Sequence, residues 1–243
     1  MKLFVGLGNP GSGYARHRHN VGFLALDRIA QRHGLGPWTK RFHGLVCDGP
    51  IGGRRVILLK PQTYMNDSGQ AVGEAQRYLK IAEEDIYVFH DEIDLAPSKL
   101  KIKSGGGNAG HNGLRSISAH IGNEFARVRI GVGHPGSKDL VSAYVLHDFA
   151  KADQDWLEPL LDAIADAAGR LTAGDAARFL TDVARKLQPD RKTDKTEAAI
   201  PAAETAAVKP PPQTGHPAGE RQSKRGSALA ENLKKWLLGR REN

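Results

Sequence analysis

The most constraining feature of this 243-residue chain is an alternation between short apolar runs and longer stretches with helical periodicity. The runs Leu3–Leu7 and Ile86–Phe89 are compact and rich in β-branched or aromatic residues, as in buried strands. By contrast, Val21 to His33 carries its apolar side chains at the spacing of one helical face. Strands that alternate with helices are typical of an α/β domain.

The same patterns predict the other elements of the first 188 residues. A turn at Gly52-Gly53 joins two strands, and Lys99–Lys103 alternates in the manner of an edge strand. We expect strands over Leu3–Leu7, Phe42–Cys47, Arg55–Leu59, Ile86–Phe89, Lys99–Lys103 and Arg127–Val132. We expect helices over Val21–His33, about Ser68–Leu79, Leu114–Ile121 and about 153–187.

The composition changes after residue 188. Residues 189–226 are rich in Ala, Pro, Lys, Thr and Gln with few large apolar groups, so we expect a disordered linker. In residues 227–243 the apolar side chains share one helical face beside several basic residues. This segment is either a basic amphipathic helix that forms on RNA, an acidic partner or a membrane surface, or a frayed tail without a role. The expected folded domain therefore covers residues 1–188.

Positive charge is concentrated where most of the glycines and histidines lie. The whole chain has a formal net charge of +8. Residues 1–150 carry 19 Lys/Arg against 13 Asp/Glu, a net charge of +6, whereas residues 151–189 carry 5 against 7, a net charge of −2. This distribution suits a polyanionic substrate such as nucleic acid, although a basic surface kept for solubility has the same composition.

The N-terminus and the single cysteine favour the cytoplasm. No apolar run approaches the ~20 residues that cross a bilayer. Met1 leads directly into a strand-like segment, which leaves no room for a signal peptide. Cys47 alone cannot form an internal disulfide or a cysteine-based zinc site, and its apolar neighbours favour a buried thiol.

A glycine-rich segment, Gly6 to Gly11, follows the first strand with the Gly-x-Gly-x-x-Gly spacing of dinucleotide-binding loops. Its context disagrees with nucleotide binding in two ways. A helix should open at the third glycine, but residues 12–20 come first. An acidic residue should end a second strand about 20 residues further on, but that region reads Arg-His-Gly-Leu-Gly-Pro-Trp. A nucleotide-dependent oxidoreductase therefore stays only a secondary alternative.

Polar side chains recur directly after the expected strands. Asn9, Asn66 and Asp91 each follow a different strand. In an open α/β sheet, ligands bind beyond the carboxyl ends of parallel strands, so these groups converge on one crevice if the strands run parallel. The segment Gly110–Gly113 lies where a helix begins, and backbone amides at such a position favour anionic or carbonyl oxygens.

The residue types present favour direct attack by water. The chain has no Gly-x-Ser-x-Gly or His-Glu-x-x-His motif, and Cys47 has no catalytic surroundings. The pairs His17/His19 and His90/Asp91 could bind a metal, but a chain with 10 histidines produces such pairs by chance. Histidine, a carboxylate and amides remain, and these suffice to activate water and to polarise an ester carbonyl.

At these residues the sequence resembles the bacterial peptidyl-tRNA hydrolase family. The resemblance covers about residues 1–188 and rests on five separated motifs. They are Gly6-Leu7-Gly8-Asn9-Pro10-Gly11 through Tyr14 to Arg18-His19-Asn20; Lys60-Pro61 through Met65-Asn66-Asp67-Ser68-Gly69; His90-Asp91-Glu92-Ile93-Asp94; Gly105-Gly106-Gly107 through Gly110-His111-Asn112-Gly113-Leu114; and Arg127 to Gly136.

The resemblance implies a monomeric, cytoplasmic enzyme without metal or cofactor. Its implied fold is a single α/β domain with a twisted, mostly parallel mixed sheet and helices on both faces. Its implied reaction is hydrolysis of the ester between a peptide, or an N-blocked aminoacyl group, and the 3′ ribose of tRNA. The implied partner is the acceptor stem and 3′ CCA end of peptidyl-tRNA, with no obligate protein partner and no membrane span.

The family's motifs also imply roles for individual residues. His19 matches the catalytic base, Asp91 the carboxylate that supports it, and Asn9 the position that distinguishes N-blocked from free aminoacyl groups. The other substrate-contacting positions are Tyr14, Tyr64, Asn66 and Asn112, with His111 as a supporting neighbour and Lys101, Lys103 and Arg129 as a basic strip for the tRNA body. We expect Asn66 or Asn112 to stabilise the oxyanion. One departure is visible, because the family usually has Thr at the position of His17.

Each of these assignments has a structural alternative. His19, Asn9 and Asn66 could be cap or turn residues, His111 could act only through a neighbour, and the two lysines could simply protect an edge strand. The main alternative for the whole protein is a non-catalytic RNA-binding protein, as in relatives of plant organelles that are associated with RNA splicing. The presence of both His19 and Asp91 argues against it, because binding alone needs no general base.

Overall fold

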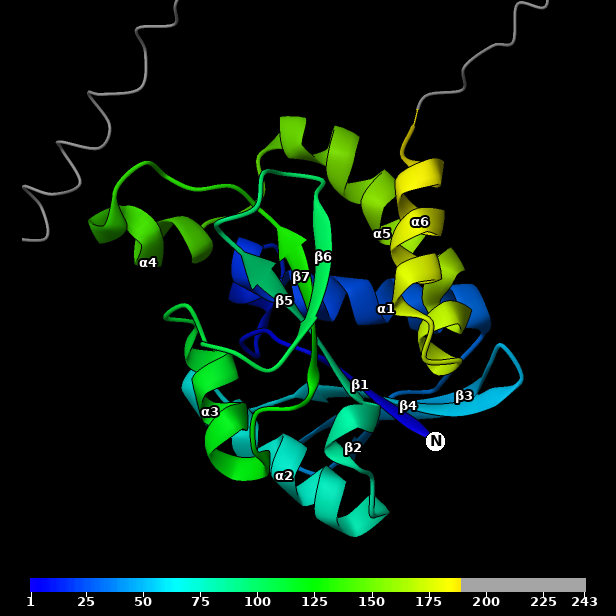
Figure 1. Cartoon of the computed structure of the whole chain (residues 1–243). Coiled ribbons are helices and arrows are strands. Elements are labelled where there is room, and N and C mark those ends of the chain that lie inside the picture. Colours follow the sequence, from blue (N-terminus) through cyan, green and yellow to red (C-terminus); the bar gives the residue numbers. More distant parts are fainter. Residues whose placement is uncertain (189–243) are drawn as a thin grey trace, which may run out of the picture. The chain divides into compact units, whose positions relative to one another are not determined.

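The computed structural model describes residues 1–188, in which seven strands form one mixed sheet in the order β2-β3-β4-β1-β5-β7-β6 (Figure 1). The strands are β1 (Lys2–Gly6), β2 (Thr39–Arg41), β3 (Gly44–Ile51), β4 (Arg54–Pro61), β5 (Ile86–Glu92), β6 (Leu100–Ser104) and β7 (Ala126–Gly131). Strands β4, β1, β5 and β7 pair in parallel, whereas β3 and β6 run against their neighbours. Because β2 is antiparallel to β3, five of the seven strands point the same way, which confirms the mostly parallel mixed sheet.

Helices cover both faces of this sheet. They are α1 (Val21–His33), α2 (Ser68–Leu79), α3 (Asn112–Ile121), α4 (Val141–Val145), α5 (Gln154–Thr172) and α6 (Ala176–Lys186). Side chains alternate between the two faces of a strand, so β1 feeds two apolar cores. Phe4 packs on the side of α1, α5 and α6, whereas its neighbours Leu3 and Val5 pack on the side of α2 and α3. Figure 1 shows these two groups of helices on opposite sides of the strands.

Most element boundaries agree with the sequence patterns, and the differences have local causes. Helices α1 and α2 have the predicted bounds. The helical stretch 153–187 is divided at Gly174, whose φ of 79° ends α5. The expected strand at Phe42 begins only at Gly44, because Phe42 and His43 form a turn with φ of 53° and 48°.

One strand and one α-helix were not predicted, and two predictions concern residues outside the described range. β2 has three exposed residues and α4 has five residues, which is too short for either to show periodicity. The expected linker and C-terminal helix lie within 189–243, beyond the described residues. No helix in residues 1–188 is long and apolar enough to cross a membrane.

Candidate active site

A cavity of about 550 Å³ lies at the carboxyl ends of β1, β4 and β5. It forms where the parallel strands end, as expected for ligand sites of open α/β sheets. Seven of the eleven predicted site residues line it: Asn9, His19, Tyr64, Asn66, Asp91, His111 and Asn112. The other four lie outside its lining: Tyr14, Lys101, Lys103 and Arg129.

Close backbone packing brings His19 to this end of the sheet. His19 lies in the 3₁₀ turn η2 (Arg18–Asn20), directly before α1. A Cβ at Gly22, in the first turn of α1, would lie 2.3 Å from the carbonyl oxygen of Phe89 on β5. A Cβ at Gly6 would in turn lie 2.4 Å from the carbonyl oxygen of Gly22. Helix packing therefore explains the first glycine of the Gly-x-Gly-x-x-Gly segment without a bound nucleotide.

His19, Asp91 and His111 share one hydrogen-bonded centre. Nδ1 of His19 lies 2.8 Å and Nε2 of His111 lies 3.0 Å from the same Oδ1 of Asp91. Nδ1 of His111 accepts the backbone N–H groups of Gly113 and Leu114 at 3.2 and 3.4 Å, so its ring proton lies on Nε2 and is donated to Asp91. His19 likewise donates from Nδ1, which leaves the lone pair of its Nε2 available to accept a proton.

Burial and mutual contact set the charge states of these groups. Burial lowers the pKa of His19, but the charge of Asp91 and its hydrogen bond raise it more, so the pKa lies above its ordinary value. Burial raises the pKa of Asp91, but the charges and hydrogen bonds of the two imidazoles bring it well below its ordinary value. Burial, with His111 nearby, lowers the pKa of the neighbouring His90 to about 3. The site therefore contains an ionised carboxylate beside a histidine whose pKa lies above its ordinary value.

The side chain of Asn9 is held in one orientation. Its Oδ1 accepts the backbone N–H of Met65 at 2.9 Å. Asn20, which is only 2% exposed, accepts the backbone N–H of Asn9 at 3.0 Å and donates to its carbonyl oxygen at 2.9 Å. With Oδ1 occupied, Asn9 presents the two hydrogens of its Nδ2 as donors. Neither Asn20 nor Met65 was predicted as a site residue, although both lie within the sequence motifs.

Two further amides and a tyrosine line the same cavity. Asn66 lies in the 3₁₀ turn η3 (Met65–Asp67) after β4, and Asn112 is the first residue of α3. Tyr64 is 62% exposed at the rim. A Cβ at Gly113 would lie 2.6 Å from the sulfur of Met65, so this glycine allows α3 to approach η3 and brings the amides together.

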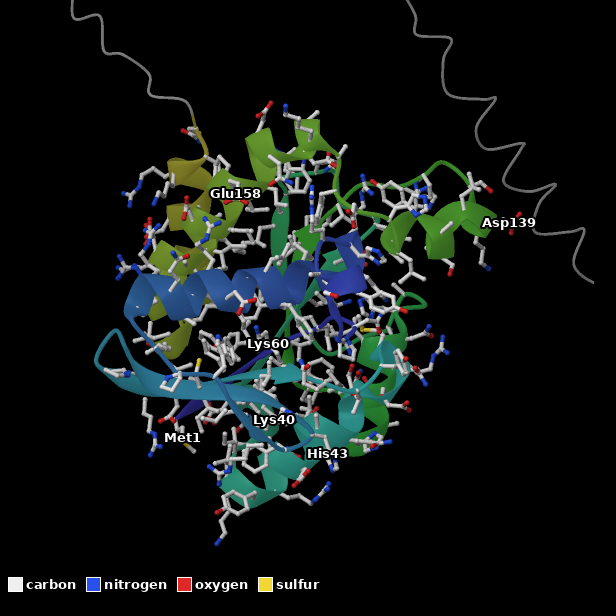
Figure 2. All side chains as sticks on the ribbon, turned by 180° about the vertical axis from the view of Figure 1, so that it is seen from behind. Met1, Lys40, His43, Lys60, Asp139 and Glu158 are labelled. Atoms are coloured by element: carbon white, nitrogen blue, oxygen red, sulfur yellow. The ribbon has the colours of Figure 1, made fainter. Side chains whose placement is uncertain are left out.

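The cavity also has an apolar wall that was not predicted from the sequence. Ile93, Val141, Val145 and Leu146 line it, three of them in or beside α4. Figure 2 shows Asp139, just before α4, at the outer end of the segment that carries α4. A helix of this length carries no periodic pattern, which is why the wall was missed.

Arg18 links the segment after α4 to the segment that carries His19. Its guanidinium donates to the carbonyl oxygen of Asp148 at 2.8 Å and pairs with Asp153 at 3.0 Å. The Arg18 Cζ also lies 4.4 Å from the centre of the Tyr144 ring. This half-buried arginine therefore fixes the end of α4 relative to His19.

The basic strip lies on β6 and β7. Lys101 pairs with Arg129 in the antiparallel register and Lys103 pairs with Arg127, so the four side chains share one face. Lys101 and Lys103 are exposed, whereas Arg129 donates to Glu92 at 2.8 Å. Arg127 is only 2% exposed and donates to the carbonyl oxygens of residues 105–107, so it organises the loop before α3.

Tyr14 and His17 face a different segment. The Tyr14 ring lies edge-on to His17, with 5.3 Å between ring centres. His17 forms a backbone bridge with Asp148, and its Nε2 lies 3.8 Å from that carboxylate. The unusual histidine therefore packs toward the segment after α4, outside the cavity lining.

The ring nitrogens of His19 and His111 and a carboxylate oxygen of Asp91 lie within 4.8 Å of one another, close enough to be considered as metal ligands. Hydrogen bonding favours another use of these atoms. Because Nδ1 of His111 accepts two backbone N–H groups, its Nε2 carries a proton and has no lone pair for a metal. A site without metal stays our prediction.

The fold and the cavity together define an α/β protein of the hydrolase class, with an imidazole–carboxylate pair and three amides at the carboxyl ends of parallel strands. The sequence profile of the peptidyl-tRNA hydrolase family matches residues 3–192, and the chain belongs to this family. This confirms the resemblance drawn from the motifs.

Named relatives of known sequence and structure agree. A peptidyl-tRNA hydrolase of Ruegeria pomeroyi is 57% identical over 212 residues, covering 87% of this chain and 88% of the relative. One of Cereibacter sphaeroides is 60% identical over 191 residues, covering 79% and 85%. The crystal structure of peptidyl-tRNA hydrolase from Acinetobacter baumannii is 42% identical, with a TM-score of 0.72 over 75% of this chain and 94% of that one.

Proposed function

We propose that this protein hydrolyses the ester between the peptide and the 3′ ribose of peptidyl-tRNA, with His19 as general base. The observation that carries the proposal is the 2.8 Å contact between Nδ1 of His19 and Asp91, which leaves Nε2 of His19 as the proton acceptor in the cavity. Asp91 holds the ring in this tautomer and stabilises the imidazolium once it forms.

The reaction proceeds by direct attack of water on the ester carbonyl. Nε2 of His19 takes a proton from water while the oxygen bonds to the carbonyl carbon. The side-chain amide of Asn66 or Asn112 donates a hydrogen bond to the resulting oxyanion. The intermediate then collapses with cleavage of the bond to the 3′ oxygen, which takes the proton back from His19 and leaves as the ribose hydroxyl.

Asn9 accounts for a preference for N-blocked substrates. Its free Nδ2 is a donor, because Met65 occupies its Oδ1. A peptide or N-acetyl group offers a carbonyl oxygen to that donor, whereas a free aminoacyl group has an ammonium there. The enzyme therefore gains binding energy only when the amino group is acylated.

The exposed lysines of the basic strip bind phosphates of the acceptor stem, while Arg129 is partly neutralised by Glu92. We infer that the enzyme acts in the cytoplasm as a monomer, without metal, cofactor or obligate protein partner. The lack of Cys-based ligands and the protonated Nε2 of His111 support a site that uses no metal.

The decisive experiment compares N-acetyl-aminoacyl-tRNA with free aminoacyl-tRNA, using the wild type and His19→Ala. We expect the wild type to cleave only the blocked substrate and the variant to lose cleavage by a factor on the order of a thousand. A non-catalytic RNA-binding protein would bind both RNAs and cleave neither. An oxidoreductase would instead be stabilised against heat by NAD.

A further inference from the structure

We propose that a surface beside β2 binds the distal part of long peptides on the substrate. This surface, the β2 surface, consists of the exposed residues Arg41, His43 and Tyr78 above the buried ring of Phe42. The inference rests on the proposed function and adds a peptide subsite to it, several residues away from the ester.

The order of the strands indicates in which direction the RNA and the peptide of the substrate lie across the sheet. The exposed cations Lys101 and Lys103 lie on β6, at one edge of the sheet. The neutral amides of Asn9 and Asn66 follow β1 and β4, on the other side of Asp91 at the end of β5. Phosphates pair with ammonium groups, whereas neutral amides suit the carbonyl and N–H groups of a peptide. RNA therefore enters from the β6 side and the peptide leaves toward β4 and β2.

The turn between β2 and β3 lies next to the segment that leads from β4 to the cavity rim. Tyr64 stands exposed at the rim, and Gln62, two residues before it, donates its backbone N–H to the carbonyl oxygen of His43 at 2.8 Å. Nε2 of His43 lies 3.2 Å from the carboxylate of Glu74 on α2. Figure 2 shows His43 next to α2 in the view from behind. A peptide that passes Tyr64 thus reaches the turn between β2 and β3 next.

The β2 surface has the composition of a peptide-binding platform. The Arg41 Cζ lies 4.6 Å from the ring centre of Phe42 and 4.7 Å from that of Tyr78. The two rings lie 5.3 Å apart, and Tyr78 is 66% exposed. A guanidinium stacked on two rings presents an apolar face and N–H donors together, which suits apolar or acidic side chains of an extended peptide.

Sheet geometry predicts which peptides reach this surface. Four strand-to-strand steps separate β5 from β2. At about 4.8 Å per step they cover roughly 19 Å. An extended peptide covers about 3.4 Å per residue, so about six residues lie between the ester and the β2 surface. Short peptides end before they reach it, and peptides of eight residues cross it.

The test compares N-acetylated dipeptidyl-tRNA with N-acetylated octapeptidyl-tRNA that carries an aspartate or a leucine at about the sixth residue from the ester. The variants are Tyr78→Ala and Arg41→Ala, with Tyr78→Phe as the conservative exchange. Arg55→Ala is the matched control, because Arg55 is another exposed arginine, and its partner is Asp48 on β3. We expect the KM for the octapeptide to rise about fivefold in both alanine variants, the size of one exposed aromatic or cation–π contact.

The dipeptide should be cleaved with unchanged kcat and KM by all variants, and Tyr78→Phe and Arg55→Ala should resemble the wild type on both substrates. An equal rise of KM for the dipeptide would overturn the proposal and identify an RNA contact. Unchanged KM for the octapeptide in both alanine variants would also overturn it. Failure of the wild type to cleave either substrate would instead contradict the proposed function.

Discussion

At the residue scale, Oδ1 of Asp91 accepts hydrogen bonds from both His19 and His111. Asp91→Asn removes the charge that raises the pKa of His19 and leaves burial, which lowers it. Because catalysis needs neutral His19, the acid limb of kcat/KM against pH should move to lower pH in this variant. The plateau should fall by a factor on the order of a hundred or more, since the ring loses its orientation. A pH profile of N-acetyl-aminoacyl-tRNA hydrolysis measures both effects.

The shift of the acid limb favours activity at low pH, whereas the lower plateau reduces activity at every pH. This combination makes the test specific. A variant that was merely unstable would lose activity throughout and keep the acid limb in place. An acid limb that does not move would show that Asp91 has no electrostatic influence on His19. Circular dichroism at each pH controls for unfolding.

His111 has two separable roles, because its Nδ1 caps α3 and its Nε2 donates to Asp91. His111→Asn keeps a good helix cap but loses the bond to Asp91, whereas His111→Ala loses both. Both variants should lose about tenfold in kcat, since a hydrogen bond to a charged group contributes about 1.5 kcal/mol. The alanine variant should lose about 1 kcal/mol more unfolding free energy than the asparagine variant, because only it also loses the helix cap. Urea unfolding beside steady-state kinetics separates the roles, and full activity of His111→Asn would exclude the link to Asp91.

At the scale of elements, the contact between the start of α1 and the strands below it decides where His19 lies. Gly22→Ala would place a Cβ 2.3 Å from the Phe89 carbonyl oxygen, which is backbone and cannot move aside cheaply. We expect a loss of about 3 kcal/mol in unfolding free energy and at least a tenfold loss of kcat, because α1 must shift and carry His19 away from Asp91. Urea unfolding and hydrolysis assays measure these effects.

Gly13→Ala is the matched control, because a Cβ at Gly13 meets nothing within 4 Å. Gly13 lies in the 3₁₀ turn η1 (Ser12–Tyr14), and Gly13→Ala should leave both stability and kcat within a small margin of the wild type. If Gly22→Ala behaved like Gly13→Ala, the close approach would not determine the geometry of the site.

Elements with strong periodicity could be predicted from the sequence, and the contacts between them could not. The apolar stripe of α1 predicted the bounds of that helix. The predicted strand ends placed Asn9, Asn66 and Asp91 together at the carboxyl ends of the strands. The α4 wall carries no such signal, because its five residues complete little more than one turn. The role of Arg127 was also hidden, since a buried arginine held by carbonyl oxygens looks like any other charge in sequence.

At the scale of the whole molecule, our proposal places RNA recognition and peptide recognition on different parts of the sheet along its width. Cations lie at the β6 edge, the imidazole–carboxylate pair follows β5, and neutral amides follow β1 and β4. A polyanion bound at one edge and a peptide bound on the other side place the ester between them. This arrangement explains why the chain combines exposed lysines at the β6 edge with amide side chains in the cavity.

Electrostatic binding of this kind predicts a specific salt dependence. Lys103 is exposed and faces solvent beside Arg127, whereas Arg129 is committed to Glu92. Lys103→Ala should therefore raise KM for N-acetyl-aminoacyl-tRNA several-fold at low salt, leave kcat nearly unchanged, and reduce the slope of log KM against log salt by about 0.7–0.9. Arg129→Ala should affect more than phosphate binding, because it also leaves the carboxylate of Glu92 buried without its partner.

The control is Arg55→Ala, on β4 away from the strip, which should keep the wild-type slope of log KM against log salt. A Lys103 variant with an unchanged slope, or one that weakens small N-blocked esters as much as the RNA substrate, would show that this lysine contacts no phosphate.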